Sequence, residues 1–451
     1  MLEKKQKLDE EQTIHPLYSR NSFDMKKRSP LNVFPEEPMN PDTAYHIVHD
    51  FAMLDGNARL NLATFGTTWM DDYANRLYSE SYDKNAIDKD EYPETAKIEM
   101  KCWKMLADLW NCEDPEHTIG CSAVGSSEAC MLGALALKRK WAEKRKAEGK
   151  PADRPNLVIS AAEQVVWLKF ANYFDVEIRR VPISLDHKCL DGYKLEDYVD
   201  ENTIGVVAIL GVTYTGMYEP VKMISEKLDE IQNKTGLDIK IHVDAATGGF
   251  VTPFLYPELE WDFRVPRVVS INASGHKYGM VYQSVAWTVW RDATQLPESL
   301  VFHVSYLGGD MPTFTLNFSK PGAQILLQYY NFLRLGFNGY KDILVALREV
   351  AQHLADEIGK MPEFELWNNP TDSPVFAWML KKDVQRNWTL FDLEDRLRMK
   401  GWQVPAYPMP EDLTSITVQR IVVREGLTMD LANELLLDIR KQVEFLEKQK
   451  G

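Results

Sequence analysis

The sequence predicts an α/β fold: a large domain with a mostly parallel sheet sandwiched between helices, followed by a smaller α+β domain at the C-terminal end. Two observations predict it. Short apolar runs rich in β-branched residues alternate with helical or loop stretches, and the order of elements changes beyond residue 360. Strands that are apolar on both faces are typical of a parallel sheet covered on both sides. The predicted strands of this sheet are residues 157–160, 176–183, 204–210, 239–243, 268–272 and 285–290.

Two segments near these strands have the features of helices. Residues 127–146 begin with small and apolar side chains and end with basic ones, which suit the C-terminal end of a helix dipole. Residues 222–234 carry apolar side chains at helical spacing and precede Gly236, which suits a helix C-cap. The second helix links two predicted strands, as a βαβ unit requires.

The C-terminal part follows a different pattern. A long helical region, with segments at 324–335 and 342–360, leads into shorter strands and helices that do not alternate regularly. This order predicts a small α+β domain attached through a long helix. Its predicted strands are residues 362–367, 375–380 and 416–424, and its predicted helices are residues 390–400 and 430–448.

The first 40 residues mix charged side chains with prolines and show no sustained period. Such a segment predicts an arm rather than a domain, and arms of this kind often mediate subunit contacts. The predicted division of the chain is an arm over residues 1–55, a large domain over 56–345 and a small domain over 346–451.

Composition and charge exclude several classes of protein. The chain has 451 residues, of which 45% are hydrophobic, and its 67 acidic against 52 basic side chains give a formal charge of −15. An acidic surface repels phosphate backbones, so nucleic-acid binding is not expected. No run approaches the roughly 20 apolar residues of a membrane span, and the charged start MLEKKQKLDEEQ lacks a signal-peptide core. Five cysteines without a C-x-x-C pair indicate reduced thiols in a cytoplasmic protein.

Two local patterns suggest a site for an anionic ligand. Residues 125–129 (GSSEA) start a predicted helix, where hydroxyls and free backbone N–H groups can hold a phosphate. Taken alone, an ordinary serine cap is the simpler explanation. Asp244 directly follows an apolar strand and therefore points to the crevice beyond the carboxyl ends of the sheet. A helix cap explains this aspartate equally well in isolation.

Two further patterns follow strands of the same sheet. Lys277 in SGHK comes after strand 268–272, and a lysine held near the sheet can form a Schiff base with an aldehyde. Most lysines are merely solvated, so this position carries little weight without its context. Residues 211–216 (GVTYTG) form a hydroxyl-rich loop, which ordinary turn chemistry explains almost as well.

Together these patterns match the requirements of pyridoxal 5′-phosphate. This cofactor needs a phosphate cradle, a carboxylate that keeps its ring nitrogen protonated, and a lysine that binds its aldehyde. Ser126 and Ser127, Asp244 and Lys277 supply these groups in that order, each beside a strand end.

The chain resembles the bacterial glutamate decarboxylases, which belong to fold type I of the pyridoxal-phosphate enzymes. The resemblance extends from about residue 57 to residue 448 and therefore implies the fold-type I transferase architecture. The motifs that carry it are GNARLNLATF, NAIDKDEYP, VGSSEACMLG, DENTIGVV, GVTYTG, HVDAATGGF, WDFR, SGHKYG, YLGG, NFSKPG and GWQVPAYP.

The resemblance implies a role for each site residue. Lys277 would bind the cofactor aldehyde, Asp244 would pair with the ring nitrogen, and Arg420 would bind the substrate α-carboxylate. The expected phosphate ligands are Ser126, Ser127, Ser274 and His276, with Ser319 reaching the phosphate of a neighbouring subunit. The expected ring contacts are Thr213 near the ring hydroxyl, Ala246 beneath the ring and Gln164 on its other face. The region expected to receive the distal carboxylate comprises Thr64, Phe65 and Asp88, partly across a dimer interface.

The implied reaction converts L-glutamate into 4-aminobutanoate and CO₂ and consumes a proton, which implies a role in acid tolerance. The resemblance also implies a homodimer as the minimal unit and leaves a hexamer open. Neither the basic calmodulin-binding extension of plant members nor a longer tail that closes the site at neutral pH is expected here. The alternatives are a decarboxylase for another amino acid on the same scaffold and a catalytically silent assembly protein. The remaining histidines suggest no metal site.

Two single positions and one short stretch depart from the family pattern. Leu168 stands where relatives carry a histidine or glutamate, which removes a titratable neighbour of the pocket or simply repacks it. Residues 283–287 replace a turn that contains Pro and Gly, and Ala286 would be costly if its backbone required a positive φ. Gly66 stands where a cysteine is common. These departures bear on activity more than on fold.

Overall fold

The structure, a computed structural model, describes residues 34–36, 38–305, 311–382 and 386–449. It divides into two units, residues 1–56 and 57–451. In the first unit, helix α1 (Pro41–Ala52) begins with Pro41, and the Asn40 side chain accepts the backbone N–H of Asp42. Most of the predicted N-terminal arm and the YLGG motif lie outside the described residues. The predicted domain boundaries stay predictions.

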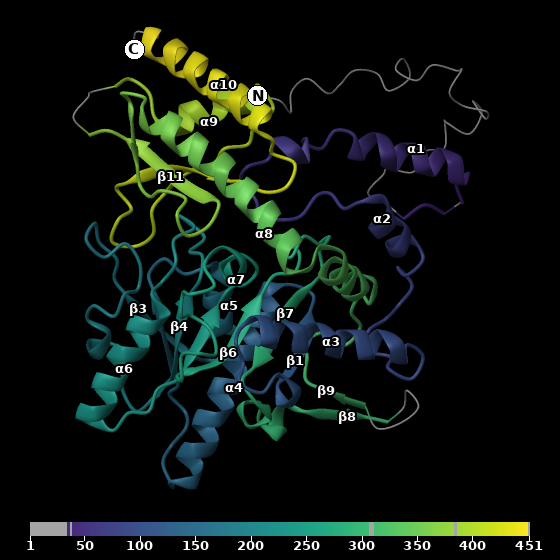
Figure 1. Cartoon of the computed structure of the whole chain (residues 1–451), viewed down its shortest axis with the longest axis vertical. Coiled ribbons are helices and arrows are strands. Elements are labelled where there is room, and N and C mark those ends of the chain that lie inside the picture. The colour runs from purple at the N-terminus through teal and green to yellow at the C-terminus, as the bar shows by residue number, and fades with distance from the viewer. Residues whose placement is uncertain (1–33, 37, 306–310, 383–385, 450–451) are drawn as a thin grey trace. The chain divides into compact units, whose positions relative to one another are not determined.

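The second unit is built around a seven-stranded sheet in the order β1-β7-β6-β5-β4-β2-β3 (Figure 1). Strand β7 alone runs against its neighbours, and the remaining pairs are parallel. The mostly parallel sheet is thereby confirmed, although β1 was not predicted. The strands are β1 (Ile119–Ala123), β2 (Asn156–Ser160), β3 (Glu177–Val181), β4 (Thr203–Ile209), β5 (Ile241–Asp244), β6 (Val268–Ala273) and β7 (Ala286–Trp290).

Helices cover this sheet. The apolar first half of helix α4 is almost entirely buried against the strands, whereas its basic last turn is not. Helix α6 ends at Gly236, whose φ of 78° lies in the left-handed region that the predicted C-cap requires. The helices of this part are α2 (Asp72–Ser79), α3 (Pro93–Leu109), α4 (Ser126–Ala147), α5 (Val165–Tyr173), α6 (Val221–Thr235) and α7 (Thr252–Leu255).

Helix α8 (Ala323–Gly359) connects the sheet region to the C-terminal elements. It packs against α3, against α7 just beyond its kink, and against β10 and β11 of the C-terminal sheet (Figure 1). Gly336, with a φ of 57°, kinks it between the two segments that the sequence predicted. The C-terminal elements are β10 (Phe364–Leu366), β11 (Val375–Leu380), α9 (Leu390–Arg398), β12 (Ala406–Pro408), β13 (Thr417–Val422) and α10 (Met429–Lys448).

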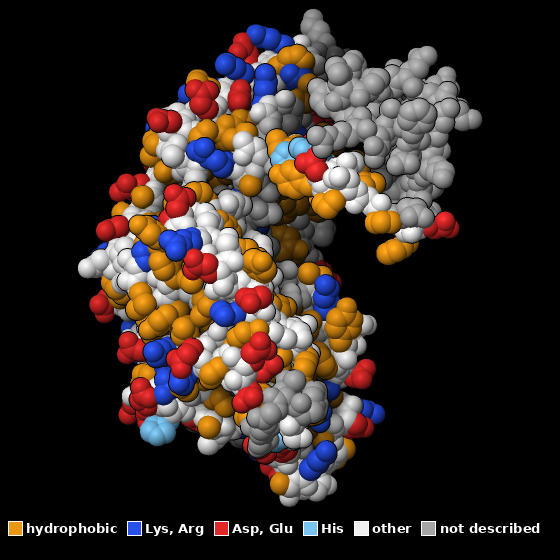
Figure 2. Space-filling view, turned by 90° about the vertical axis from the view of Figure 1, so that its right-hand side faces the viewer, with side chains coloured by type: hydrophobic (Ala, Val, Ile, Leu, Met, Phe, Trp, Pro, Cys, Tyr) orange, Lys and Arg blue, Asp and Glu red, His pale blue; other side chains and the backbone are white. Residues whose placement is uncertain are grey.

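The C-terminal strands form an antiparallel sheet in the order β10-β11-β13-β12. A short hairpin, β8 (Phe302–Val304) and β9 (Met311–Thr313), completes the strands of the described ranges. None of the helices in those ranges carries an apolar stretch that could cross a bilayer. Acidic and basic side chains are interspersed over the face in Figure 2. The five cysteines form no disulfide with one another.

Candidate active site

Asp244 and Lys277 lie at the carboxyl ends of two adjacent strands. Asp244 is the last residue of β5, and Lys277 follows the end of β6. The two strands pair in parallel, with Asp244 opposite Asn272. The sheet therefore brings together two residues that are far apart in the sequence, at the edge where α/β sheets bind ligands.

The Asp244 carboxylate is buried, with only 5% of the residue exposed, and both its oxygens accept hydrogen bonds. Trp167 of α5 donates its indole N–H to Oδ2 at 3.0 Å. The Asn272 amide at 3.3 Å and the Ala246 backbone N–H at 3.2 Å both donate to Oδ1. Three donors therefore fix the orientation of this buried carboxylate.

Behind this carboxylate, a second layer of polar side chains fixes Asn272. His242 is fully buried, with Nε2 2.8 Å from the Asn272 amide oxygen and Nδ1 2.8 Å from the Ser270 hydroxyl. Burial lowers the pKa of His242 to about 4, so its imidazole is neutral. A neutral ring can donate to Asn272 and accept from Ser270, which turns the Asn272 amide group toward Asp244.

Lys277 is partly buried beside the aromatic ring of Phe65, which also contacts the guanidinium of Arg420. Its Nζ lies 4.8 Å from the centre of the Phe65 ring, and the Arg420 guanidinium lies 5.1 Å from the same ring. Burial lowers the pKa of Lys277, an effect that the Asp244 carboxylate opposes and Arg420 reinforces. A lowered lysine pKa increases the fraction of neutral amine, the form that attacks an aldehyde.

The residues of the predicted anion site lie at and around the N-terminus of α4. No side chain caps this helix, so its first backbone N–H groups are available to a ligand. Ser126 and Ser274 share a hydrogen bond between their hydroxyls, and Ser127 is exposed. The Nδ1 atom of His276 is buried without a partner among the described residues, and burial lowers its pKa to about 4. An orphaned nitrogen beside an uncapped helix fits a phosphate ligand.

Arg420, on β13, reaches this region from the C-terminal sheet. Its two Nη atoms donate to the backbone carbonyls of Thr213 and Ala63, and its Nε is buried without a partner in the described ranges. Arginine has five N–H donors, so several remain for a carboxylate. The structure thus brings Thr213 and Phe65 to the same guanidinium.

Other predicted residues are not joined to Lys277 by a described contact. Gln164 caps α5, where its side-chain oxygen accepts the Val166 N–H at 2.6 Å. The Ser319 hydroxyl is exposed and accepts from the Asn85 amide at 3.2 Å. Asp88 accepts the Glu91 N–H at 3.1 Å. Thr64 is exposed, one residue before Phe65.

The departures from the family pattern have simple structural explanations. Ala286 begins β7 and does not have a positive φ, so the cost considered for it does not arise; the positive φ in this segment is at Ser284, 81°. A Cβ on Gly66 would lie 2.2 Å from the Gln283 side chain, so these two departures fit each other. Leu168 is 39% exposed on α5.

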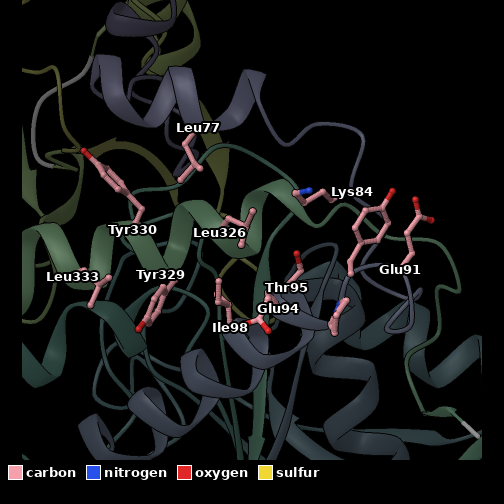
Figure 3. A pocket seen from close by; sticks show the side chains of 12 residues that line it. Leu77, Lys84, Glu91, Glu94, Thr95, Ile98, Leu326, Tyr329, Tyr330 and Leu333 are labelled. Carbon is pink, nitrogen blue, oxygen red and sulfur yellow. The ribbon is translucent and has the colours of Figure 1, made fainter.

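A separate groove of about 530 Å³ lies between α8 and α3 (Figure 3). Leu326 and Tyr329 project into it from α8, and Ile98 lines it from α3. None of the predicted site residues lines it. Over the described ranges, no group of three or more His, Cys, Asp or Glu side chains is arranged to hold a metal ion.

Sequence reasoning missed the residues that support Asp244 and Lys277. Trp167 acts from a helix 77 positions earlier in the chain, and no spacing rule predicts such a contact. Asn272 offered a signal, because it is a polar residue at the end of a predicted strand. Arg424 also offered a signal. It lies four positions beyond Arg420 on an extended segment, so the two side chains are expected on the same face.

The site defines a class of protein. An amine with a lowered pKa, a buried carboxylate on the adjacent strand and an uncapped helix N-terminus are the features of an α/β enzyme that binds a phosphorylated aldehyde cofactor. The residues present therefore fit pyridoxal 5′-phosphate.

Comparison with known proteins agrees with this class. The family model of the pyridoxal-dependent decarboxylase conserved domain matches residues 35–380. Glutamate decarboxylase from Aliivibrio fischeri is 50% identical over 446 residues, 96% of each chain, and that from Lactococcus lactis subsp. lactis is 47% identical over 99% of this chain and 96% of its own. The solved glutamate decarboxylase of Lactobacillus brevis superposes with a TM-score of 0.91 at 45% identity, covering 94% of this chain and 97% of that one.

The chain belongs to the pyridoxal-dependent decarboxylase family. The predicted resemblance to bacterial glutamate decarboxylases, the fold-type I architecture and the pyridoxal-phosphate cofactor are confirmed at this level.

Proposed function

We propose that this chain catalyses the decarboxylation of L-glutamate to 4-aminobutanoate and CO₂ with pyridoxal 5′-phosphate as cofactor. The observation that carries the proposal is the placement of Lys277 and Asp244 on adjacent strand ends, with Arg420 and Phe65 beside the lysine. The names of the relatives, which are glutamate decarboxylases at 46–50% identity, support the choice of substrate.

Lys277 and Asp244 have complementary tasks in this proposal. When bound, the cofactor supplies an electron-accepting ring for the charge left as CO₂ departs. Lys277 would hold the cofactor aldehyde, and its lowered pKa favours the neutral amine that this bond requires. Asp244 would keep the ring nitrogen protonated, because its carboxylate is fixed by Trp167 and Asn272.

Arg420 would bind the substrate α-carboxylate. Its guanidinium is held by two backbone carbonyls, which fix its plane while leaving the buried Nε and further N–H groups for a carboxylate. A planar fork suits this task because it orients as well as attracts the anion. Thr64, Phe65 and Asp88 would receive the distal carboxylate.

The phosphate group would lie at the N-terminus of α4. Ser126, Ser127, Ser274 and His276 would bind it, together with the free backbone N–H groups of the helix. Gln164, Thr213 and Ala246 would contact the ring. Ser319 would contribute from a neighbouring subunit, since its hydroxyl is exposed and bonded to Asn85 rather than to this cradle. Because Ser319 would act in the site of a neighbouring subunit, the smallest active unit would be a homodimer. Such dimers could assemble further into a hexamer.

The reaction balances with one proton consumed. The bond between the α-carbon and its carboxylate breaks, the electron pair stays with the α-carbon, and a proton adds at the same carbon. Because each turnover removes a proton, we propose a role in acid tolerance in the cytoplasm.

Borohydride trapping tests the proposal. Reduction of the cofactor-loaded protein, followed by peptide mapping, should label Lys277, and Lys277→Ala should carry no label. In parallel, glutamate, aspartate and aromatic amino acids are compared for CO₂ release and for 4-aminobutanoate. A label on another lysine would overturn the site, and preferential release from another amino acid would overturn the substrate.

A further inference from the structure

Arg424 has no assigned role in the site, yet it makes an unusual set of contacts. It is 3% exposed, two residues beyond β13. Its Nη2 donates to the carbonyls of Ala58 at 2.6 Å and Asn61 at 2.8 Å. Its Nη1 donates to the Gly66 carbonyl and the Thr68 hydroxyl, both at 3.0 Å. All four Nη hydrogens are thus directed at one segment, residues 58–68.

That segment is held in two different ways. Around residues 60–62, backbone hydrogen bonds join it to Gln403 and to Val422, as an added strand would be. From residue 63 onward, the described segment makes no further backbone hydrogen bonds to Gln403 or Val422. There the chain is held by Arg420 at the Ala63 carbonyl and by Arg424 at Gly66 and Thr68.

The part of the segment from Ala63 to Thr68, which lacks this backbone pairing, faces the site. Phe65 lies against Lys277, and Thr67 donates its N–H to the His276 carbonyl at 2.8 Å and its hydroxyl to the Lys277 carbonyl at 2.9 Å. The segment between Ala63 and Thr68 is therefore fixed by the lysine strand end on one side and by two arginines on the other.

We propose that Arg424 is a positioning residue for substrate selectivity. It holds residues 63–68 in the conformation in which Thr64 and Phe65 receive the distal carboxylate of the substrate, and it does so without touching substrate or cofactor. This inference rests on the proposed function, because it assigns the distal carboxylate to this segment. Lysine cannot replace Arg424, since an ammonium has three N–H donors and cannot satisfy four acceptors.

The test uses the cofactor-loaded enzyme and the variant Arg424→Lys. Two quantities are measured: the affinity for glutarate, read from the change in cofactor absorbance on binding, and the affinity for pyridoxal 5′-phosphate itself. We expect glutarate to bind about tenfold more weakly, as loss of charge-assisted hydrogen bonds implies. The KM for glutamate should rise by a similar factor, with a smaller change in kcat. Cofactor affinity should stay within about twofold of the wild type.

Arg267→Lys is the matched control. Arg267 is also buried, at 4% exposure, and also donates to several acceptors, including Asp229 and the Ile239 carbonyl, but it lies outside the segment. It should lower stability without weakening glutarate binding. A loss of glutarate affinity in this control equal to that in Arg424→Lys would mean that general destabilisation explains both, and would overturn the inference.

A second variant covers the case in which Arg424→Lys fails to fold. Thr68→Val removes one exposed acceptor of Arg424 and leaves the arginine in place. It should weaken glutarate binding in the same direction but to a smaller extent. Unchanged glutarate affinity in a folded, cofactor-loaded Arg424→Lys, or in Thr68→Val when the former does not fold, refutes the positioning role. Wild-type enzyme that loads cofactor at Lys277 but neither binds glutarate nor decarboxylates glutamate would instead refute the proposed function.

Discussion

The carboxyl group of Glu425 should make the stability of this protein fall between acidic and neutral pH. Glu425 follows Arg424 and hydrogen-bonds to Thr67 and the Thr68 backbone, next to the site segment. Burial raises its pKa from an ordinary 4.5 to about 7, and Arg424 and these hydrogen bonds only partly oppose the rise. One pKa unit is worth about 1.36 kcal/mol, so the shift corresponds to about 3 kcal/mol.

The sign follows from which state binds the proton more tightly. Below pH 4.5 Glu425 is protonated in both the folded and unfolded protein, and the full stability is present. Between pH 4.5 and about 7 the unfolded chain releases the proton first, so the free energy of unfolding falls as pH rises. Above about pH 7 the loss is complete.

Glu425→Gln separates this effect from the other titrating groups. The amide resembles the protonated carboxyl, so the variant should match the wild type at pH 4.5 and exceed it by about 3 kcal/mol at pH 8. Urea unfolding followed by tryptophan fluorescence, at equal cofactor excess, measures both differences. Glu434→Gln, an exposed position on α10, is the control and should show no such pH-dependent gap. A gap of equal size at both pH values for Glu425→Gln would refute the reasoning.

Two further predictions concern buried polar contacts. Trp167→Phe removes a donor to the Asp244 carboxylate and should lower kcat/KM for glutamate by about tenfold to a hundredfold, measured at saturating cofactor; an unchanged value would show that this hydrogen bond does not support Asp244. Glu99 and Lys320 form a buried ion pair of 2.9 Å, which Glu99→Gln weakens. This variant should lower the free energy of unfolding, measured in urea, by about 3–5 kcal/mol. The double variant Glu99→Gln, Lys320→Met should recover much of this loss. A double variant as unstable as the single one would contradict this account.

The parallel strands and the residues at their ends were predictable because their signals are local. A buried strand such as β4 is a continuous apolar run, and a polar residue directly after such a run, as at Asp244, marks the ligand edge of the sheet. The two segments of α8 were predicted from the same kind of local signal, and the structure adds the kink at Gly336 between them.

Strand β1 could not be predicted from such signals. Its sequence, IGCSA, is small and polar, and it is a strand because it pairs with β7 and packs closely on α3. A Cβ on Gly120 would lie 2.8 Å from the Trp103 side chain, so the glycine, unfavourable for strand propensity, is what permits the contact. Helix α3 did carry a signal that was not used, a proline at its first position.

The contribution of the C-terminal sheet to the site depends on one strand. Alternate residues of an extended chain share a face, so Arg420 in β13 and Arg424 just beyond it can address the same segment. Both use backbone carbonyls as acceptors, which any sequence at those positions would offer. The two arginines therefore hold the backbone at residues 63 and 66 whatever side chains stand there, whereas Thr67 and Thr68 contribute their own hydroxyls. If Thr64 and Phe65 receive the distal carboxylate as proposed, substitutions at these two positions should change which substrate is accepted while the arginines keep the segment in place against Lys277.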